Sequence, residues 1–214
     1  MSVEKNTNQI IAIVDYGMGN LLSVKKKLDS LSKFTKISSD PAEILASDKI
    51  ILPGVGHFRK AMENLHTTGL YEALNEAVLI KKKPVFGICL GMQLMAKHSE
   101  EGNTEGLGWI DANVVKFDVK DKLIYKVPHT GWNQIASKKE SKLMIGIPEF
   151  SEFYFVHAYH LKLNENCLDA LHETDYEYPF ISAIENENII GVQYHPEKSH
   201  KIGELMLKNF VENY

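Results

Sequence analysis

The sequence predicts an α/β fold with one open, mostly parallel sheet and helices on both faces of that sheet. Over the first hundred residues, short continuous apolar runs alternate with amphipathic segments. This alternation is typical of strands that are buried on both faces and separated by helices. After residue 102 the runs become shorter and alternate in polarity, so we expect some antiparallel strands in the C-terminal half.

Bulk composition favours a single domain over residues 1–214, with a polar leader at 1–9. A net charge of -4 offers no basic surface for nucleic acid. Two cysteines are too few for a disulfide framework, and no apolar run approaches the ~20 residues that span a bilayer. We therefore expect a soluble cytoplasmic protein without a bound cofactor or metal.

The first strand is expected at 10–14, where the run is apolar and rich in β-branched residues. A turn with two glycines follows at 15–20, and 21–31 has the pattern of an amphipathic helix. The turn carries only G-x-G and lacks the third glycine of a dinucleotide-binding fingerprint. We interpret it as a tight turn at the carboxyl edge of the sheet.

The same reasoning places the remaining elements of the chain. Further strands are expected at 34–37, 49–52, 84–87, 114–117, 123–125, 132–135, 153–159, 180–184 and 189–194. Further helices are expected at 41–46, 57–65, 70–80, 92–96 and 202–211.

Cys89 lies in Gly87-Ile88-Cys89-Leu90-Gly91, a G-x-C-x-G segment between an apolar run and a helical segment. This is the nucleophile-elbow pattern with sulfur in place of the serine oxygen. The two glycines allow the strand to turn sharply into a helix, so that the nucleophile projects without crowding. At the start of a helix, the dipole and the free N–H groups favour the thiolate. An ordinary buried cysteine is the alternative.

A nucleophilic thiol needs a base, and the base needs an acceptor on its other ring nitrogen. His195 and Glu197 fit these two roles, because both follow the last apolar strand. In a parallel sheet they would meet Cys89 at the carboxyl edge. A structural histidine, satisfied by a hydrogen bond near the core, is the alternative for His195.

Gly54-Val55-Gly56 follows another buried strand. Glycines on both sides of Val55 allow the backbone to present its N–H groups, as an anion or oxyanion site requires. By itself, this segment is better explained as a plain connecting turn.

Taken together, GICLGMQ at 87–93, PGVG at 53–56 and GVQYHPEKS at 191–199 resemble the class I, triad-type glutamine amidotransferases, in the order in which that family carries them. DYGMGN at 15–20, PHTGWN at 128–133 and YFVHAY at 154–159 are similar to the glutaminase subunits of that family that serve histidine biosynthesis. The resemblance covers the whole chain after the leader. It implies a flavodoxin-like fold.

The resemblance also implies roles for individual residues. Cys89 would attack the carboxamide of glutamine, His195 would carry the proton to the departing ammonia, and Glu197 would orient His195. Backbone N–H groups of Leu90 and of the Gly54-Val55 region would hold the oxyanion. The residues implied for glutamine binding are Gly56, Gln93, Glu101, Ala158 and Tyr159. Relatives often carry serine or threonine at Ala158, so any hydroxyl contact there is lost.

The implied partner is a (β/α)8-barrel cyclase subunit that receives the ammonia. Asn20, Trp132, Tyr154 and Lys198 lie at positions expected in that heterodimer interface. Core packing is the alternative for Trp132 and Tyr154, because aromatic side chains are common in both settings.

Other functions remain open from the sequence. A cysteine peptidase or γ-glutamyl hydrolase would share the elbow, although the HPE segment and Gln93 favour glutamine. A paralogous amidotransferase would deliver ammonia for amidination of a surface sugar. An inactive scaffold conflicts with an intact Cys89, His195 and Glu197. A zinc site built on His157, His160 and Cys167 matches no known tetrahedral spacing.

Overall fold

A computed structural model of the chain describes residues 9–32 and 34–214. The polar leader predicted over 1–9 lies outside the described residues, apart from Gln9.

Five parallel strands form the half of the main sheet that carries the predicted elbow. Their order is β2 (Thr35–Ser38), β1 (Ile11–Val14), β3 (Lys49–Gly54), β4 (Val85–Cys89) and β14 (Ile189–Val192). All neighbours in this group pair in parallel. The last strand of the chain therefore lies directly beside the strand that ends in the predicted nucleophile.

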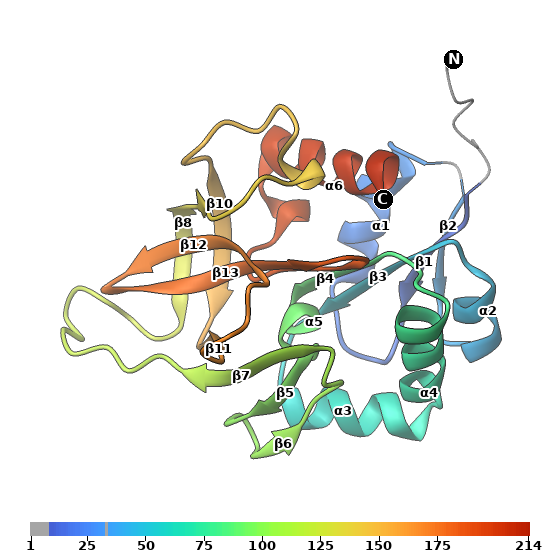
Figure 1. The fold of residues 1–214 in the computed structure, drawn as a ribbon, viewed down its shortest axis with the longest axis horizontal. Helices are drawn as coiled ribbons and strands as arrows, with labels where there is room; N and C mark the ends of the chain where they lie inside the picture. The colour runs from blue at the N-terminus through green and yellow to red at the C-terminus, as the bar shows by residue number, and fades with distance from the viewer. Residues whose placement is uncertain (1–8, 33) are drawn as a thin grey trace.

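Helices cover both faces of this parallel half (Figure 1). One face carries α1 (Leu21–Asp29) and α6 (His200–Asn213). The other carries α2 (Pro41–Ala46), α3 (Phe58–Thr67) and α4 (Leu70–Asn75). A π-helical turn at Glu76–Ile80 continues α4. This arrangement confirms the predicted fold class.

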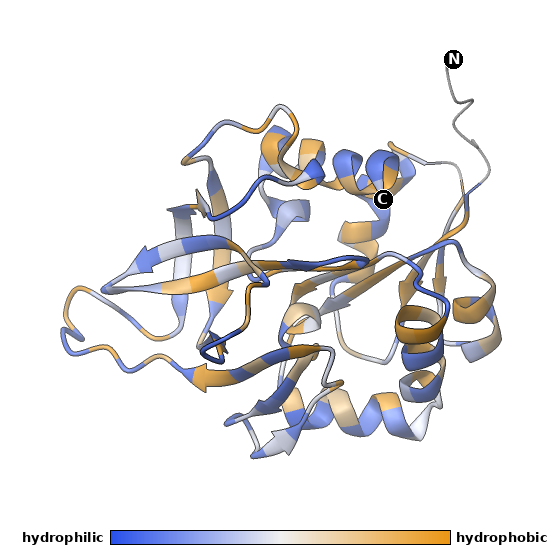
Figure 2. Cartoon of the chain, in the orientation of Figure 1, coloured by the Kyte–Doolittle hydropathy of each residue, from blue (hydrophilic) through white to orange (hydrophobic). Residues whose placement is uncertain are grey.

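The alternation of side chains along the strands divides the core into two clusters. In β1, Ala12 and Val14 pack with the α2, α3 and α4 side, whereas Ile11 and Ile13 pack with α1 and α6. Both sets are fully buried because a strand with helices on both sides has no polar face. Figure 2 shows the resulting hydrophobic colour along the central strands, with hydrophilic residues on the outer surfaces of the helices.

The second half of the main sheet is largely antiparallel, and the prediction of some antiparallel strands there is confirmed. From β14 it continues through β13 (Tyr178–Asn186), β11 (Tyr159–Leu163), β7 (Ile110–Lys116), β5 (Ala96–Ser99) and β6 (Thr104–Glu105). At its margin, β12 (Ala170–Tyr176) pairs with β13 and with β9 (Ala136–Ser137). Two 3-10 turns, at Lys142–Met144 and Pro196–Lys198, complete the described elements apart from α5 and a separate small sheet.

That small sheet corrects one prediction. The single strand expected at 153–159 is two strands, because the chain changes sheets at Ala158. β10 (Glu152–His157) pairs antiparallel with β8 (His129–Gln134) in a two-stranded sheet, and β11 starts at Tyr159 in the main sheet. A continuous apolar run does not reveal a change of pairing partner.

Two other local predictions are wrong. The strand expected at 123–125 is a turn, in which the Asp121 carboxylate accepts from the backbone N–H groups of Leu123 and Ile124. Leu123 is 87% exposed, so the apolar run there is not core. The helix expected to reach Ala96 ends at Gln93, because Ala96 already pairs with Ile110 in the sheet.

The sequence did not predict β5, β6 or β12. Among the described helices, none is long and apolar enough to cross a membrane.

Candidate active site

The predicted elbow is a sharp turn between β4 and α5 (Leu90–Gln93). Cys89 ends the strand with φ 54 and ψ -111, and the helix begins at the next residue. A positive φ is unfavourable for a residue with a side chain, and such strain is concentrated at functional sites. Backbone strain at Cys89 thus coincides with the proposed nucleophile.

Glycine is required on both sides of this turn. A Cβ at Gly91 would overlap the carbonyl oxygen of Leu52 in β3, and one at Gly87 would lie 2.8 Å from the backbone nitrogen of Met92. Real Cβ atoms are not found so close to backbone atoms. The predicted need for glycine is confirmed, and its physical cause is the close packing of α5 against β3 and β4.

Strand register brings the other predicted residues to the same edge. Gly54 is paired with Cys89, and Val192 is paired with Ile88. The chain that leaves β14 therefore passes the thiol and delivers His195 and Glu197 beside it. The prediction that the ends of these strands gather at one edge is confirmed for Gly54 and Cys89.

His195 and Glu197 form a buried hydrogen-bonded pair. The Nδ1–H of His195 donates to Oε1 of Glu197 over 2.8 Å, and the two side chains are only 2% and 1% exposed. This bond fixes the tautomer, so Nε2 is the atom left for the thiol. Nε2 has no hydrogen-bond partner among the described residues.

Burial by itself would lower the pKa of His195, since it disfavours the charged ring. The Cys89 thiol and the Glu197 carboxylate outweigh burial and raise this pKa to about 9. The environment therefore favours an imidazolium at neutral pH, the form that can donate a proton to a leaving group.

A cavity of about 380 Å³ opens over the elbow. It includes every residue predicted for the oxyanion and for glutamine except Gly54, which lies beside Cys89 in the sheet register. The lining residues are Val55, Gly56, Cys89, Leu90, Gln93, Glu101, Pro128, Val156, His157, Ala158 and Tyr159.

Hydrogen bonds within the protein determine which atoms face a ligand. Oε2 of Glu101 accepts from the backbone N–H of Phe58 at 2.8 Å. Nε2 of Gln93 donates to the Tyr159 carbonyl and to Oε1 of Gln193, each at 2.9 Å. Both amide hydrogens of Gln93 are used in this way, so its oxygen remains for the cavity.

The backbone at Ala158 and Tyr159 is also partly committed. The Ala158 carbonyl accepts from the backbone N–H of Phe117 at 3.1 Å. The Tyr159 carbonyl accepts from Gln93 and from Nδ1 of His157. Because a carbonyl oxygen has two lone pairs, the backbone of Tyr159 has only its N–H group to offer a ligand.

Two residues near the thiol were not singled out from the sequence. Gln193 is fully buried, and its amide donates to the Cys89 sulfur over 3.6 Å. The available signal was a polar residue at the end of an apolar strand. Tyr16, from the glycine turn after β1, lies under Gly54, where its hydroxyl would clash with any added Cβ. Burial and the nearby thiol raise the pKa of Tyr16.

Three of the four predicted interface residues form one surface cluster. Trp132 is 45% exposed and stacks on His200 with ring centroids 4.9 Å apart, so it is not core. Its ring also meets Tyr154 edge to face, and Nζ of Lys198 lies 5.6 Å from the Tyr154 ring centroid. Asn20 is exposed at the N-terminal cap of α1, apart from these ring contacts.

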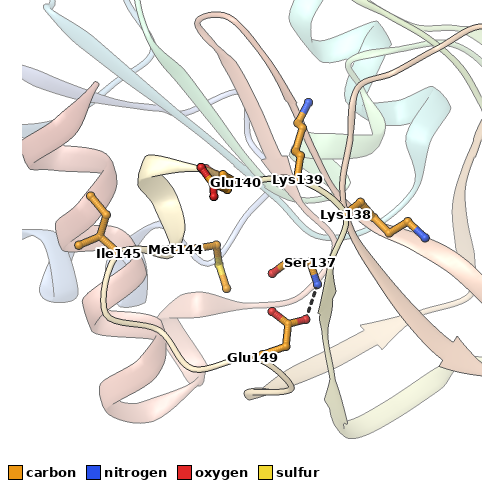
Figure 3. A pocket seen from close by; sticks show the side chains of 8 residues that line it. Ser137, Lys138, Lys139, Glu140, Met144, Ile145 and Glu149 are labelled. Carbon is orange, nitrogen blue, oxygen red and sulfur yellow. Dashed lines mark hydrogen bonds between the residues drawn. The ribbon is translucent and has the colours of Figure 1, made fainter.

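A second hollow, of about 500 Å³, lies between β9 and the 3-10 turn at Lys142–Met144 (Figure 3). Charged surface side chains surround it, and the Glu149 carboxylate accepts there from the backbone N–H of Ser137. It contains none of the predicted site residues. Cys167 is a free thiol that donates a hydrogen bond to the Asp169 carboxylate. No metal-binding group of three or more side chains occurs within 9–32 and 34–214.

Comparison with known proteins agrees with this geometry. The family model described as "Glutamine amidotransferase class-I" matches residues 12–214. "Imidazole glycerol phosphate synthase subunit HisH 2" of Methanococcus maripaludis is 45% identical over 95% of this chain and 99% of its own length. The protein of the same name from Pseudomonas aeruginosa is 44% identical with the same coverage. The HisH subunit of Sulfurimonas denitrificans is 47% identical over 95% of this chain and 98% of its own.

Solved structures show the same fold at low sequence identity. A glutamine amidotransferase crystal structure has a TM-score of 0.72 at 14% identity, covering 95% of this chain and 97% of the other. A second, from Thermotoga maritima, has a TM-score of 0.65 at 14% identity, covering 96% and 97%. With a family match over nearly its whole length and relatives above 40% identity, the chain belongs to the class-I glutamine amidotransferases.

Proposed function

We propose that the chain is the glutaminase subunit of an imidazole glycerol phosphate synthase and that it releases ammonia from glutamine through Cys89, His195 and Glu197. The observation that carries this proposal is the elbow itself. A strained cysteine at a helix start lies at the same sheet edge as a buried His–Glu pair whose free nitrogen is Nε2. The relatives named as synthase subunits support the pathway.

In the first half of the reaction, the Cys89 thiolate attacks the side-chain carbonyl carbon of glutamine and forms a tetrahedral intermediate. His195 holds the proton from the thiol on Nε2 and gives it to the amide nitrogen as the C–N bond breaks. Ammonia leaves, and a γ-glutamyl thioester remains on Cys89. Glu197 keeps the ring oriented and stabilises the imidazolium through Nδ1.

In the second half, water attacks the thioester while Nε2 of His195 takes its proton. The intermediate collapses, the sulfur leaves as a thiolate, glutamate is released, and the starting pair of Cys89 thiolate and His195 imidazolium is restored. No redox step or external cofactor enters the balance. Backbone N–H groups of Leu90 and Val55, both at the cavity, are our candidates for the oxyanion donors.

We propose that the amino-acid end of glutamine lies between α5 and the loop at Ala158. The oxygen of Gln93 and the carboxylate of Glu101 suit the α-ammonium group, because both are acceptors at the cavity. Gly56 and the N–H of Tyr159 suit the α-carboxylate. The polar end is thereby distinguished from the carboxamide, which points to Cys89.

The partner in this proposal is a (β/α)8-barrel cyclase subunit that consumes the ammonia. Trp132, Tyr154 and Lys198 form the surface that we assign to it, and Asn20 would extend that surface. We also infer a single domain, because both core clusters pack on one sheet. The two unpaired cysteines suit a cytoplasmic setting.

Ammonia production should depend on the partner. Glycines on both sides of Val55 allow the peptide that carries the Val55 N–H to turn toward or away from the oxyanion position at little steric cost, and Gly56 already has φ +113. A missing oxyanion donor costs about a hundred- to a thousandfold in rate, so we expect at least that activation on assembly with a liganded barrel. The test is the glutamine hydrolysis rate of the isolated chain, the complex and the liganded complex.

A rate for the isolated chain equal to that of the liganded complex would contradict this dependence. Hydrolysis of γ-glutamyl peptides in preference to glutamine would instead favour the hydrolase alternative. Activation by a barrel that amidinates a sugar would favour the paralogous amidotransferase.

A further inference from the structure

Gln193 is a fully buried polar residue that the three-residue mechanism does not use. It follows Val192, which pairs with Ile88, so it lies beside Cys89 where β14 leaves the sheet. Its Nε2 is 3.6 Å from the Cys89 sulfur, a normal distance for an N–H···S hydrogen bond.

The direction of this hydrogen bond follows from its neighbours. The Tyr159 carbonyl can only accept, so the NH₂ group of Gln93 must face it. The same NH₂ group then donates to Gln193, which must turn its oxygen toward Gln93. The NH₂ group of Gln193 is left facing the sulfur.

A second chain of hydrogen bonds starts at Asn133 on β8 and also ends at the Tyr159 carbonyl. The Asp175 carbonyl requires the NH₂ group of Asn133, which also contacts Nε2 of His129 at 3.4 Å. Nε2 of His129 is then an acceptor, so its Nδ1–H donates to Nε2 of His157 over 3.1 Å. Nδ1–H of His157 in turn donates to Tyr159 over 2.8 Å. The carbonyls of Asp175 and Tyr159 can only accept, and they lie at the two ends of this chain of hydrogen bonds. Together they determine which atom donates in each bond between them.

The charge states of the two histidines support this assignment. A histidine–histidine hydrogen bond in a buried chain needs one ring to accept, so that ring must be neutral. Burial lowers the pKa of His129 to about 4, and burial first and neighbouring rings second hold the pKa of His157 well below its usual value. Both rings therefore stay neutral, and the chain of bonds is unchanged around pH 7.

We propose that Gln193 is a fourth catalytic residue, whose amide N–H, held in place by Gln93 and the Tyr159 carbonyl, donates a hydrogen bond to the Cys89 sulfur and stabilises the thiolate. This inference deepens the proposed function and rests on it for its role in turnover. A neutral amide stabilises the anion by hydrogen bonding and adds no charge that would compete with His195. It also connects the glutamine-binding residue Gln93 to the nucleophile.

The other titratable groups near the sulfur are His195, with Glu197 behind it, Tyr16 and His157. His195 supplies the opposite charge, whereas Tyr16 and His157 stay neutral. The carbonyl of Val156 is 4.0 Å from the sulfur and can only accept. The carbonyl oxygen disfavours negative charge on the sulfur, and the hydrogen bond donated by the neutral Gln193 amide offsets that effect.

The test is the rate at which iodoacetamide alkylates Cys89, measured against pH in a Cys167→Ala background so that one thiol reacts. Gln193→Met keeps the size of the side chain but removes both polar atoms. Gln193→Glu keeps an oxygen that accepts from Gln93 and replaces the NH₂ group with a second carboxyl oxygen, whose negative charge would disfavour the thiolate further. Thermal melting of both variants checks that the fold is retained.

We expect alkylation at pH 7 to fall about tenfold or more in both variants, as for a lost hydrogen bond to a charged group. The pH profile should move to higher pH and converge with the parent rate at high pH. Glutamine turnover should fall in kcat more than it changes KM.

Unchanged alkylation profiles in two folded variants would overturn the inference. Because alkylation needs no glutamine, it decides the role of Gln193 even if the parent chain failed to hydrolyse glutamine. That failure would refute the proposed function instead. A variant that melts early is replaced by the other, since the two disturb the Gln93 contact differently.

Discussion

Two edges of this molecule contrast in how they are built. At the β3–β4–β14 edge, parallel register and close backbone packing place Cys89 and His195 almost out of solvent. On the β8–β10 sheet, Trp132 and Tyr154 are held by ring contacts on an accessible surface. Changes at the first edge should therefore cost reaction rate or stability, whereas changes at the second should cost association. Substitutions can test this contrast.

The largest expected effect is that of Cys89→Ala. Without the sulfur, no thioester forms, and glutamine hydrolysis should fall by about five or six orders of magnitude, as when the nucleophile of a triad is removed. Alanine fits the buried position, so the melting temperature should stay within a few degrees of the parent. Ammonia release and thermal melting measure the two effects. Activity near the parent level would end the nucleophile assignment.

Glu197→Gln should have the next largest effect. The amide cannot hold the imidazolium as a carboxylate does, so we expect a loss of about a hundred- to ten-thousandfold in kcat. His195→Ala should lose more. A Glu197→Gln variant with the parent rate would mean that another group orients the ring.

The same substitution has a signature in the pH profile. With a pKa of about 9 for His195, activity should decline as pH rises through about 9, because the imidazolium that protonates the departing amide nitrogen is lost. Glu197 helps to raise this pKa, so Glu197→Gln should move the decline to lower pH. Rate profiles between pH 6 and 10 measure this movement, and an unmoved decline would contradict it.

The raised pKa of His195 also makes the folding stability depend on pH in a definite direction. The folded pKa of His195 lies above its unfolded value of 6.5, so its stabilising contribution is fully present below about pH 6.5. That contribution is lost as pH rises toward about 9. Denaturant midpoints for the parent and Glu197→Gln should thus converge at high pH.

Gly91→Ala tests the packing of the first edge. The new methyl group would overlap the Leu52 carbonyl, and backbone cannot move aside cheaply, so we expect a loss of about 3 kcal/mol or more in unfolding free energy. Gly108→Ala is the control for a methyl group that meets no neighbour, although the positive φ of Gly108, which Gly91 lacks, adds backbone strain of its own. That control should cost about 1 kcal/mol. Equal costs in urea unfolding would show that packing at Gly91 is unimportant.

The contrast also explains what the sequence could predict. Short stretches of sequence specify the elbow, the HPE segment and the strands beside them. The turn, for example, requires Gly87, Cys89 and Gly91 to lie close together in the sequence. Their meeting at one edge followed from the rules of parallel sheets. Most of the cavity was therefore predicted from the sequence.

The second region depends on pairings between distant segments. Nothing local marks Ala158 as the point where the chain changes sheets, and the turn held by Asp121 competes with the strand that its apolar residues suggested. The role of Gln193 was hidden for the same reason, because its hydrogen bonds join residues about a hundred positions apart.

Lys198→Ala should have the smallest effect and test the second region directly. Lys198 is exposed and lies over the Tyr154 ring, whereas the adjacent Glu197 is buried against His195. Removing the cation should weaken binding of the proposed barrel subunit by about 1 kcal/mol, or roughly fivefold in Kd, and the difference should shrink at high salt. Lys201→Ala, an exposed lysine at the start of α6, is the control. Calorimetric titrations at two salt concentrations, with alkylation of Cys89 measured in parallel, separate association from chemistry. If Lys198→Ala slowed alkylation but left Kd unchanged, the surface cluster would belong to the catalytic edge, and the division between the two regions would be wrong.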